Sequence, residues 1–100
     1  MTDSAATLKP TGAGDYQLSG CLDFISVPRL LRQGHDWLGN GSRVQLDLSG
    51  VTRCNSAALG LLLEWRRQAA ARKTGLLLRN IPPPLLEIAR VSELESFLGD

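Results

Sequence analysis

The sequence predicts an α/β fold in a single domain. Four segments have the pattern of β-strands and three have the pattern of helices. Their order along the chain is strand, strand, helix, strand, helix, strand, helix. Strands that alternate with helices normally lie parallel in one sheet and are joined by right-handed crossovers. The length of 100 residues suits one domain, and no repeat, low-complexity tract or linker divides the chain.

The first elements follow from local patterns. Residues 1–14 mix small and polar residues, so we expect a loose arm, with one short edge strand around Ala6 to Lys9, before a single domain over residues 15–100. Apolar and polar residues alternate from Tyr16 to Leu22, which predicts a half-buried strand.

A helix is predicted to run from Val27 to Leu38. Ser26 supplies a capping hydroxyl, a proline follows in the first turn, and the run Gly39-Asn40-Gly41 ends the helix. The inner stripe of this helix is expected to contain Leu31, Gly34 and Leu38, with Leu30 and Trp37 adjoining.

The middle of the chain gives the clearest signals. Val44 to Leu48 alternates as a strand, and the polar run Ser49 to Cys54 is expected to form a turn. Asn55 is a natural N-cap for a long helix over Ala57 to Lys73, which Gly75 closes.

The last elements are shorter. The unbroken apolar run within Gly75 to Arg79 predicts a short buried strand, because it is too short for a helix. Pro82-Pro83-Pro84 opens a final helix that continues to Val91. A last turn is expected to pack Leu94, Phe97 and Leu98 against the domain.

Composition excludes several classes of function. A net charge of +1 gives no field strong enough to require a nucleic acid or an anionic membrane as partner, and no apolar run approaches the roughly 20 residues of a spanning helix. No secretory signal precedes the domain, so we expect a cytoplasmic protein with Cys21 and Cys54 reduced. Neither a metal site nor a cofactor site is expected.

An enzyme is not favoured either. The chain's one histidine, His35, lies in the middle of an amphipathic helix, where a solvated side chain is the simpler interpretation than a general base. The acidic residues Asp23, Asp47 and Glu64 lie on separate elements, and no glycine run has the strand-to-helix context of a phosphate-binding loop.

The most informative stretch places a polar segment directly before a helix. With Asn55 as N-cap, Ser56 takes the first helical position, and its hydroxyl is free to face solvent or a partner. A phosphate on Ser56 would be favoured by the positive end of the helix. The alternative is that both residues only cap the helix.

These residues resemble the signature of STAS domains, the fold of anti-sigma factor antagonists. The resemblance is carried by the segments LSGCLD at residues 18–23 and LDLSGVTRCNSAALGLLL at residues 46–63, and it covers about residues 15–98. It implies a SpoIIAA-like fold with a mixed, mostly parallel sheet of about four strands and three to four helices. At the position of Ser56 the family carries its phosphorylation switch. Here Asn55 replaces the usual Asp, and Ala57-Ala58 replaces the usual Ser/Gly pair.

Within the family the chain is most similar to the short MlaB group, the cytoplasmic STAS subunits of phospholipid-transport ABC complexes at the bacterial inner membrane. This resemblance implies a non-catalytic subunit that binds and regulates or stabilises the ATPase subunit of a complex maintaining outer-membrane lipid asymmetry. It implies no nucleic-acid partner and no direct membrane insertion. In that group the residue at the position of Ser56 contacts the ATPase.

A helical wheel suggests which face of the second helix contacts that partner. Leu59, Leu62, Leu63, Ala69 and Ala70 fill an arc wide enough for the core, and a neighbouring shoulder is left for a partner. The alternative is that Leu61 and Trp65 pack under a neighbouring helix. The expected partner-binding residues are Thr52, Asn55, Ser56, Ala57, Ala58, Leu61, Trp65 and Arg72.

The sequence also predicts a basic segment and leaves a second class of function open. The segment from Glu64 to Arg79 carries a local charge of +4, which would steer a partner more than strengthen its binding. The alternative function is an anti-sigma factor antagonist switched by phosphorylation of Ser56. A third class, direct binding of lipid or nucleotide, is selected by no residue.

Overall fold

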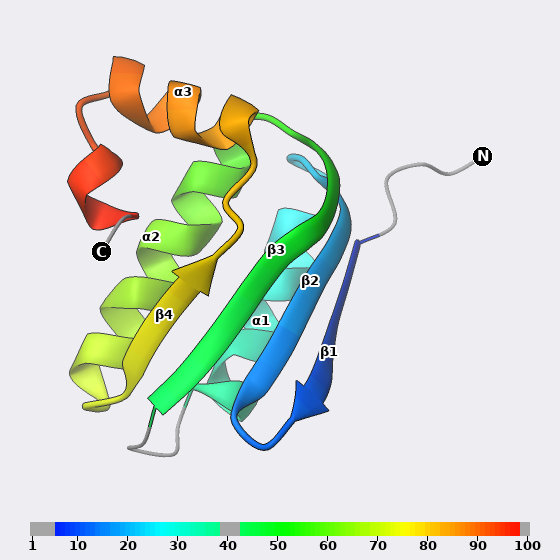
Figure 1. The fold of residues 1–100 in the computed structure, drawn as a ribbon, viewed down its shortest axis with the longest axis vertical. Helices are drawn as coiled ribbons and strands as arrows, with labels where there is room; N and C mark the ends of the chain where they lie inside the picture. Colours follow the sequence, from blue (N-terminus) through cyan, green and yellow to red (C-terminus); the bar gives the residue numbers. More distant parts are fainter. Residues whose placement is uncertain (1–5, 39–42, 99–100) are drawn as a thin grey trace.

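The computed structural model describes residues 6–38 and 43–98, which form a four-stranded sheet with helices packed on one of its faces (Figure 1). The strands lie in the order β1-β2-β3-β4, with β1 antiparallel to β2 and with β2, β3 and β4 parallel. Their bounds are Ala6–Gly12 (β1), Asp15–Leu22 (β2), Arg43–Cys54 (β3) and Gly75–Arg79 (β4). The predicted α/β class and mostly parallel sheet are confirmed.

Three α-helices and a short 3₁₀ turn accompany this sheet. Their bounds are Val27–Trp37 (α1), Ser56–Ala71 (α2), Pro83–Val91 (α3) and Glu95–Phe97 (η1). Helices α1 and α2 lie behind the sheet in Figure 1, and α3 crosses the end of the molecule toward which the parallel strands run. The loop between β2 and α1 and the junction between β3 and α2 therefore meet at this same end.

The sheet is buried on its helix side only. Val44, Leu46 and Leu48 of β3 are almost fully buried, whereas the intervening Gln45 and Asp47 are half-buried. The alternation continues in β4, where Leu76 and Leu78 are buried but Leu77 is 44% exposed. The prediction that residues 75–79 form a strand is confirmed, but the strand is buried on one face only, because no helix of the described residues covers the other face of the sheet.

Strand β3 is longer than the sequence predicts. The segment Ser49 to Cys54, expected to be a turn, continues the strand, and the register against β2 shifts between Gln17 and Ser19 and again between Gly20 and Cys21. A Cβ on Gly50 would lie 2.7 Å from the Cβ of Ser19, so only glycine permits this close approach. Local β-bulges thus allow a polar segment without apolar alternation to pair as part of the strand.

The first strand and first helix also differ in detail from their predictions. Strand β1 extends to Gly12, beyond the expected Lys9, while residues 1–5 and the expected stop at Gly39–Gly41 lie outside the described residues. In α1 the core side chains are Leu30 and Trp37, which are 1% and 3% exposed, whereas Leu31 is only half-buried. Leu38 of the predicted stripe is buried as expected, so the buried face combines it with Leu30 and Trp37, the residues predicted to adjoin the stripe, while Leu31 is less buried than predicted.

Helix α2 is the central helix of the domain. Its N-terminus is capped by Asn55 as predicted, and it ends at Ala71, before the left-handed residue Lys73 (φ 58°) rather than at Gly75. It contacts α1, α3 and β4, so more than one of its faces is covered. The described residues contain no helix that is both long and apolar enough to cross a membrane.

This arrangement corrects the helical-wheel prediction. Ala58, Leu61 and Trp65, expected on a shoulder open to a partner, are 0% exposed, while Ala70 of the expected core arc is exposed. The alternative prediction, packing under a neighbouring helix, is confirmed for Trp65. Its ring contacts that of Trp37 in α1 edge-on, at a centroid distance of 4.9 Å. The wheel failed because it assumed one covered face for a helix that has neighbours on several sides.

The C-terminal part also departs from its prediction in detail. Helix α3 begins at Pro83, with Pro82 as a cap residue that makes no side-chain hydrogen bond. Leu98 is buried and Leu94 half-buried, as expected of a packed last turn, but Phe97 is 53% exposed. This exposed ring lines a cleft beside α2.

Candidate functional site

The candidate site begins at the junction of β3 and α2. The Asn55 side chain, with the backbone extended at φ −130° and ψ −165°, accepts a hydrogen bond of 2.8 Å from the Ala57 N–H. This bond satisfies one of the open N–H groups of the first turn. Asn55 is therefore engaged as the cap, and the exposed Ser56 hydroxyl has no hydrogen-bond partner among the described residues.

The Ser56 side chain is exposed, and Asn55 rather than Ser56 caps the helix. Substitution of an exposed side chain at the first helical position changes the free energy of unfolding only slightly. The structure thus separates the two roles that the sequence left open: Asn55 caps the helix and Ser56 does not.

The loop between β2 and α1 is fixed by reciprocal hydrogen bonds between Asp23 and Ser26. Asp23 Oδ1 accepts from the backbone N–H groups of Ile25 (3.0 Å) and Ser26 (2.9 Å), while Ser26 Oγ accepts from the Asp23 N–H (3.1 Å). Ser26 Oγ also donates to the Cys21 carbonyl at 2.8 Å. Ser26 was expected to supply a capping hydroxyl; in the structure Asp23 and Ser26 together form a capping box.

Two large apolar side chains stand out from this fixed loop. Phe24 is 69% exposed and Ile25 is 79% exposed, although the backbone that carries them is held by Asp23. Side chains of this size contribute to folding only when they are buried, and fixed exposed aromatic residues are enriched at protein-binding hot spots. Neither residue was predicted from the sequence, because two apolar residues in a loop show no helix or strand periodicity.

A backbone hydrogen bond holds this loop beside the start of α2. The Asn55 N–H donates to the Leu22 carbonyl at 3.2 Å, and Leu22 pairs with Cys54 across the sheet. The exposed loop and the exposed serine therefore belong to one end of the molecule, the upper end in Figure 1. We name this region the Ser56 surface, composed of Phe24, Ile25, Thr52, Asn55, Ser56 and Ala57.

Thr52 is exposed at this surface because of a bulge in β3. Gly20 pairs with Val51 and Cys21 pairs with Arg53, so Thr52 is the extra residue between two register positions. Bulges of this kind redirect side chains and occur often beside functional sites. The structure therefore places Thr52 at the same end of the sheet as Asn55 and Ser56.

The remaining predicted site residues lie elsewhere. Ala58, Leu61 and Trp65 are buried inside the domain and reach no partner without unfolding. Arg72 lies at the opposite end of α2, about 24 Å along the helix axis from Ser56 at 1.5 Å per residue. The remaining residues of α2, 57–71, thus lie between Arg72 and Ser56.

Two titratable groups near the Ser56 surface have shifted pKa values. Hydrogen bonds, chiefly from the Ser26 N–H, lower the pKa of Asp23. Burial, with the Cys21 thiol nearby, raises the pKa of Cys54, which keeps this thiol protonated and weakly nucleophilic at neutral pH. Among the described residues there is no group of three or more metal-ligating side chains, and the side chain of His35 lies outside them.

The basic segment from Glu64 to Arg79, which spans α2 and β4, is partly engaged within the domain. Arg67 pairs with Glu64 at 2.5 Å, which lowers the pKa of Glu64 to about 2, and Arg79 donates to the Gln45 side chain at 3.0 Å. Arg66 donates to the carbonyls of Leu76 (3.3 Å) and Leu98 (3.2 Å). These residues lie beyond the Ser56 surface, so the expected charge steering is not concentrated at that surface.

Solved structures with the same fold include two of the anti-sigma factor antagonist SpoIIAA. The structure of its unphosphorylated form matches with a TM-score of 0.71 and 18% sequence identity, covering 96% of this chain and 87% of that chain. The structure of the Bacillus cell fate determinant SpoIIAA in its phosphorylated form matches with a TM-score of 0.69 and 19% identity, covering 96% and 90%. At these identities the likeness establishes the fold.

A search of curated protein sequences finds no significant match. The family model described as "Mlab, STAS domain" matches residues 10–99, which is most of the chain and includes the whole Ser56 surface. With the four-stranded sheet and the SpoIIAA-like topology, this match shows that the chain belongs to the STAS domain family and is MlaB-like.

Proposed function

We propose that this protein is a non-catalytic regulatory subunit that binds the ATPase of a phospholipid-transport ABC complex at the bacterial inner membrane. The observation that carries the proposal is the Ser56 surface, where an uncommitted serine hydroxyl lies beside two exposed apolar side chains on a fixed loop. The MlaB-like family model supports this class of partner over other partners of STAS domains. Localisation at the membrane would follow from the complex.

The proposed mechanism requires no catalytic group on this chain. A subunit that binds one conformation of an ATPase more tightly than another shifts the population toward the first conformation. The shift is limited by the difference between the two affinities, commonly about 1–3 kcal/mol for such couplings. Binding at the Ser56 surface would thereby raise ATP hydrolysis or stabilise the assembled complex.

Charge substitutions at Ser56 test the contact. Ser56→Asp and Ser56→Lys are expected to leave the domain folded and to weaken ATPase binding, because an unmatched charge buried in an interface costs about 2–5 kcal/mol. Asp at this position even complements the helix dipole, so loss of binding by Ser56→Asp would not reflect a loss of fold. The measurement is a pull-down with the ATPase subunit, followed by ATPase assays of the complex.

Thr11 provides the matched control, since it is exposed at the end of β1, away from the Ser56 surface. Thr11→Asp and Thr11→Lys should bind normally. Equal binding by all four variants would remove Ser56 from the contact and, with it, the proposed function in this form.

The second candidate is a phosphorylation-switched anti-sigma factor antagonist. It is favoured by the fold shared with SpoIIAA, which is described in phosphorylated and unphosphorylated forms, and by the exposed Ser56 hydroxyl at a helix start. Intact-mass analysis of protein purified from its native cells distinguishes the candidates. A phosphate group on Ser56 together with a co-purifying kinase favours the antagonist; an unmodified chain that co-purifies with a transporter ATPase favours the subunit.

A further inference from the structure

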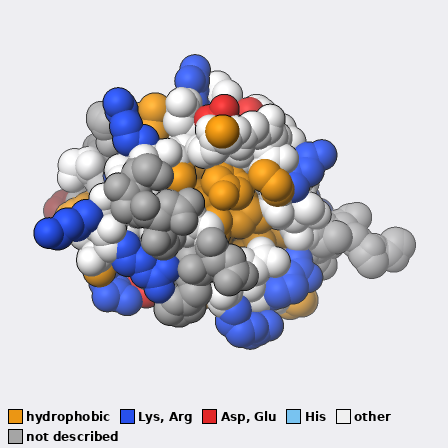
Figure 2. Space-filling view, turned by 90° about the horizontal axis from the view of Figure 1, so that it is seen from below, with side chains coloured by type: hydrophobic (Ala, Val, Ile, Leu, Met, Phe, Trp, Pro, Cys, Tyr) orange, Lys and Arg blue, Asp and Glu red, His pale blue; other side chains and the backbone are white. Residues whose placement is uncertain are grey.

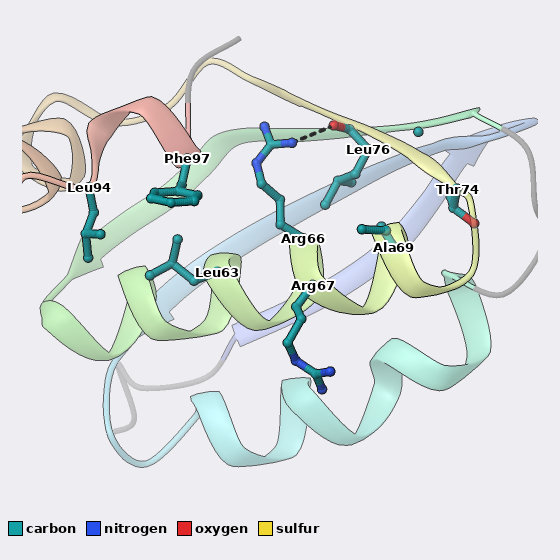
Figure 3. A pocket seen from close by; sticks show the side chains of 10 residues that line it. Leu63, Arg66, Arg67, Ala69, Thr74, Leu76, Leu94 and Phe97 are labelled. Carbon is teal, nitrogen blue, oxygen red and sulfur yellow. Dashed lines mark hydrogen bonds between the residues drawn. The ribbon is translucent and has the colours of Figure 1, made fainter.

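A second surface feature lies on the outer side of α2, away from the residues of the Ser56 surface. It is a cleft of about 730 Å³ between α2, the start of β4 and the C-terminal segment that carries η1 (Figure 3). Clefts that bind small ligands typically measure about 300–1,000 Å³ and are lined mainly by apolar side chains. The apolar residues of this lining are Leu63, Ala69, Ala70, Leu76, Leu94 and Phe97.

The cleft carries a cation that no described carboxylate neutralises. Arg66 lies between α2 and β4, and its two terminal nitrogens donate to the Leu76 and Leu98 carbonyls, which hold the guanidinium in place without cancelling its charge. Arg67, the other cation in the lining, is paired with Glu64. The described part of the chain thus leaves one fixed positive charge in an apolar cleft.

The hydrogen bond from Arg66 to the Leu76 carbonyl disfavours a β-strand as the occupant. Strand β4 forms an edge of the sheet, and an added strand would need the backbone groups along that edge. Arg66 already occupies the Leu76 carbonyl. An occupant that requires no backbone ladder, but brings apolar surface and a negative charge, matches the cleft better.

We propose that this cleft binds a single-chain anionic amphiphile, with an alkyl chain along the apolar lining and an anionic head group at Arg66. The chain would cover the exposed ring of Phe97 and the exposed Ala70, and its burial would supply most of the affinity. A carboxylate or a phosphate at Arg66 would form charge-assisted hydrogen bonds. The inference shares no residue with the Ser56 surface and does not depend on the proposed ATPase partner.

The test is isothermal titration calorimetry of the full chain with three dodecyl probes below their micellar concentrations. Dodecanoate and dodecyl phosphate represent the two sources of an anionic head group, and dodecyltrimethylammonium carries the same alkyl chain with the opposite charge. Saturable binding is expected for at least one anion, with affinity for the cation weaker by about tenfold or more, a difference of about 1.4 kcal/mol.

Two adjacent exposed alanines supply a matched pair of variants. Ala70 lines the cleft and Ala71 does not, so Ala70→Phe should fill the cleft and weaken anion binding by about tenfold or more, whereas Ala71→Phe should bind like the wild type. Arg66→Lys, which keeps the positive charge, should retain the preference for anions. Absence of saturable anion binding, equal binding of the cation, or unchanged binding by Ala70→Phe would each overturn the proposal.

Discussion

Trp65 joins the two helices that cover the sheet. Its ring packs edge-on against Trp37, whose ring in turn lies 4.9 Å from that of Tyr16 in β2, so three aromatic rings connect the sheet, α1 and α2. The Trp65 side chain is 0% exposed, and its indole N–H is buried without a hydrogen-bond partner. Packing therefore outweighs the cost of an unpaired donor at this residue.

Truncation of Trp65 should destabilise the domain strongly. Trp65→Ala is expected to lower the free energy of unfolding by about 3–5 kcal/mol, comparable to Leu62→Ala at about 2–5 kcal/mol, because both leave a cavity in the core. Trp65→Phe should cost less, since it keeps a ring and removes the unpaired N–H. Urea unfolding measures all three variants. A loss below about 1 kcal/mol for Trp65→Ala would show that its site is not core.

The Asp23 carboxylate gives the β2–α1 loop a dependence on pH. Hydrogen bonds lower its pKa below the ordinary 3.8, so their stabilising effect is present above this value and is lost as the pH falls through the lowered pKa. The stability difference between the wild type and Asp23→Asn should therefore be present at pH 7 and disappear in strong acid. Urea unfolding at both pH values tests this; an equal difference at both would show that the charged carboxylate does not matter.

At the scale of single elements, β3 and α2 differ in how they use glycine. Gly50 in β3 lies against Ser19, where an added Cβ would come within 2.7 Å of the serine Cβ, whereas nothing lies within 4 Å of a Cβ added to Gly60 in α2. Gly50 is thus required by strand packing. Gly60 only lowers the helix propensity of an exposed position.

The two glycines should respond oppositely to alanine. Gly50→Ala is expected to lower the free energy of unfolding by about 1–3 kcal/mol through overpacking against β2. Gly60→Ala should raise it by about 0.5–1 kcal/mol, because alanine favours the helix and no neighbour clashes. Thermal or urea melts of both variants provide the comparison. Destabilisation by Gly60→Ala as large as that by Gly50→Ala would contradict the assigned packing.

Element types were predictable because their signals are local. Alternation identified β2 and the first half of β3, and the Asn55 cap located the start of α2 within one residue. The second half of β3 was not predictable, since its pairing depends on a close approach of Gly50 to another strand. The burial of Leu61 and Trp65 depends on how many helices surround α2, which a helical wheel does not contain.

In the candidate site, too, only the residues with local sequence signals were predictable. Asn55 and Ser56 were found because capping is a local signal, whereas Phe24 and Ile25 were missed because exposure is a property of the whole fold. One local signal was available: the spacing of Asp23 and Ser26 is that of a capping box, which fixes the two residues between them. A fixed loop that contains large apolar residues indicates a contact surface.

At the scale of the whole molecule, the two proposed binding sites lie in different regions. The end toward which the parallel strands run carries the Ser56 surface, and the outer side of α2 carries the cleft with Arg66. The opposite end, shown in Figure 2, presents hydrophobic side chains surrounded by Lys and Arg. A small α/β domain with one covered sheet face thus has several separate surfaces available for binding.

The central claim is that the Ser56 surface binds the transporter ATPase, and equilibrium binding of that ATPase to Phe24→Ser and Ile25→Ser tests it most directly. Both variants should fold normally, because these side chains are 69% and 79% exposed, yet each should weaken binding by about tenfold or more. Leu77→Thr, a change at an exposed apolar residue on the open face of the sheet, should bind within about twofold of the wild type. Wild-type affinity in both loop variants would contradict the claim.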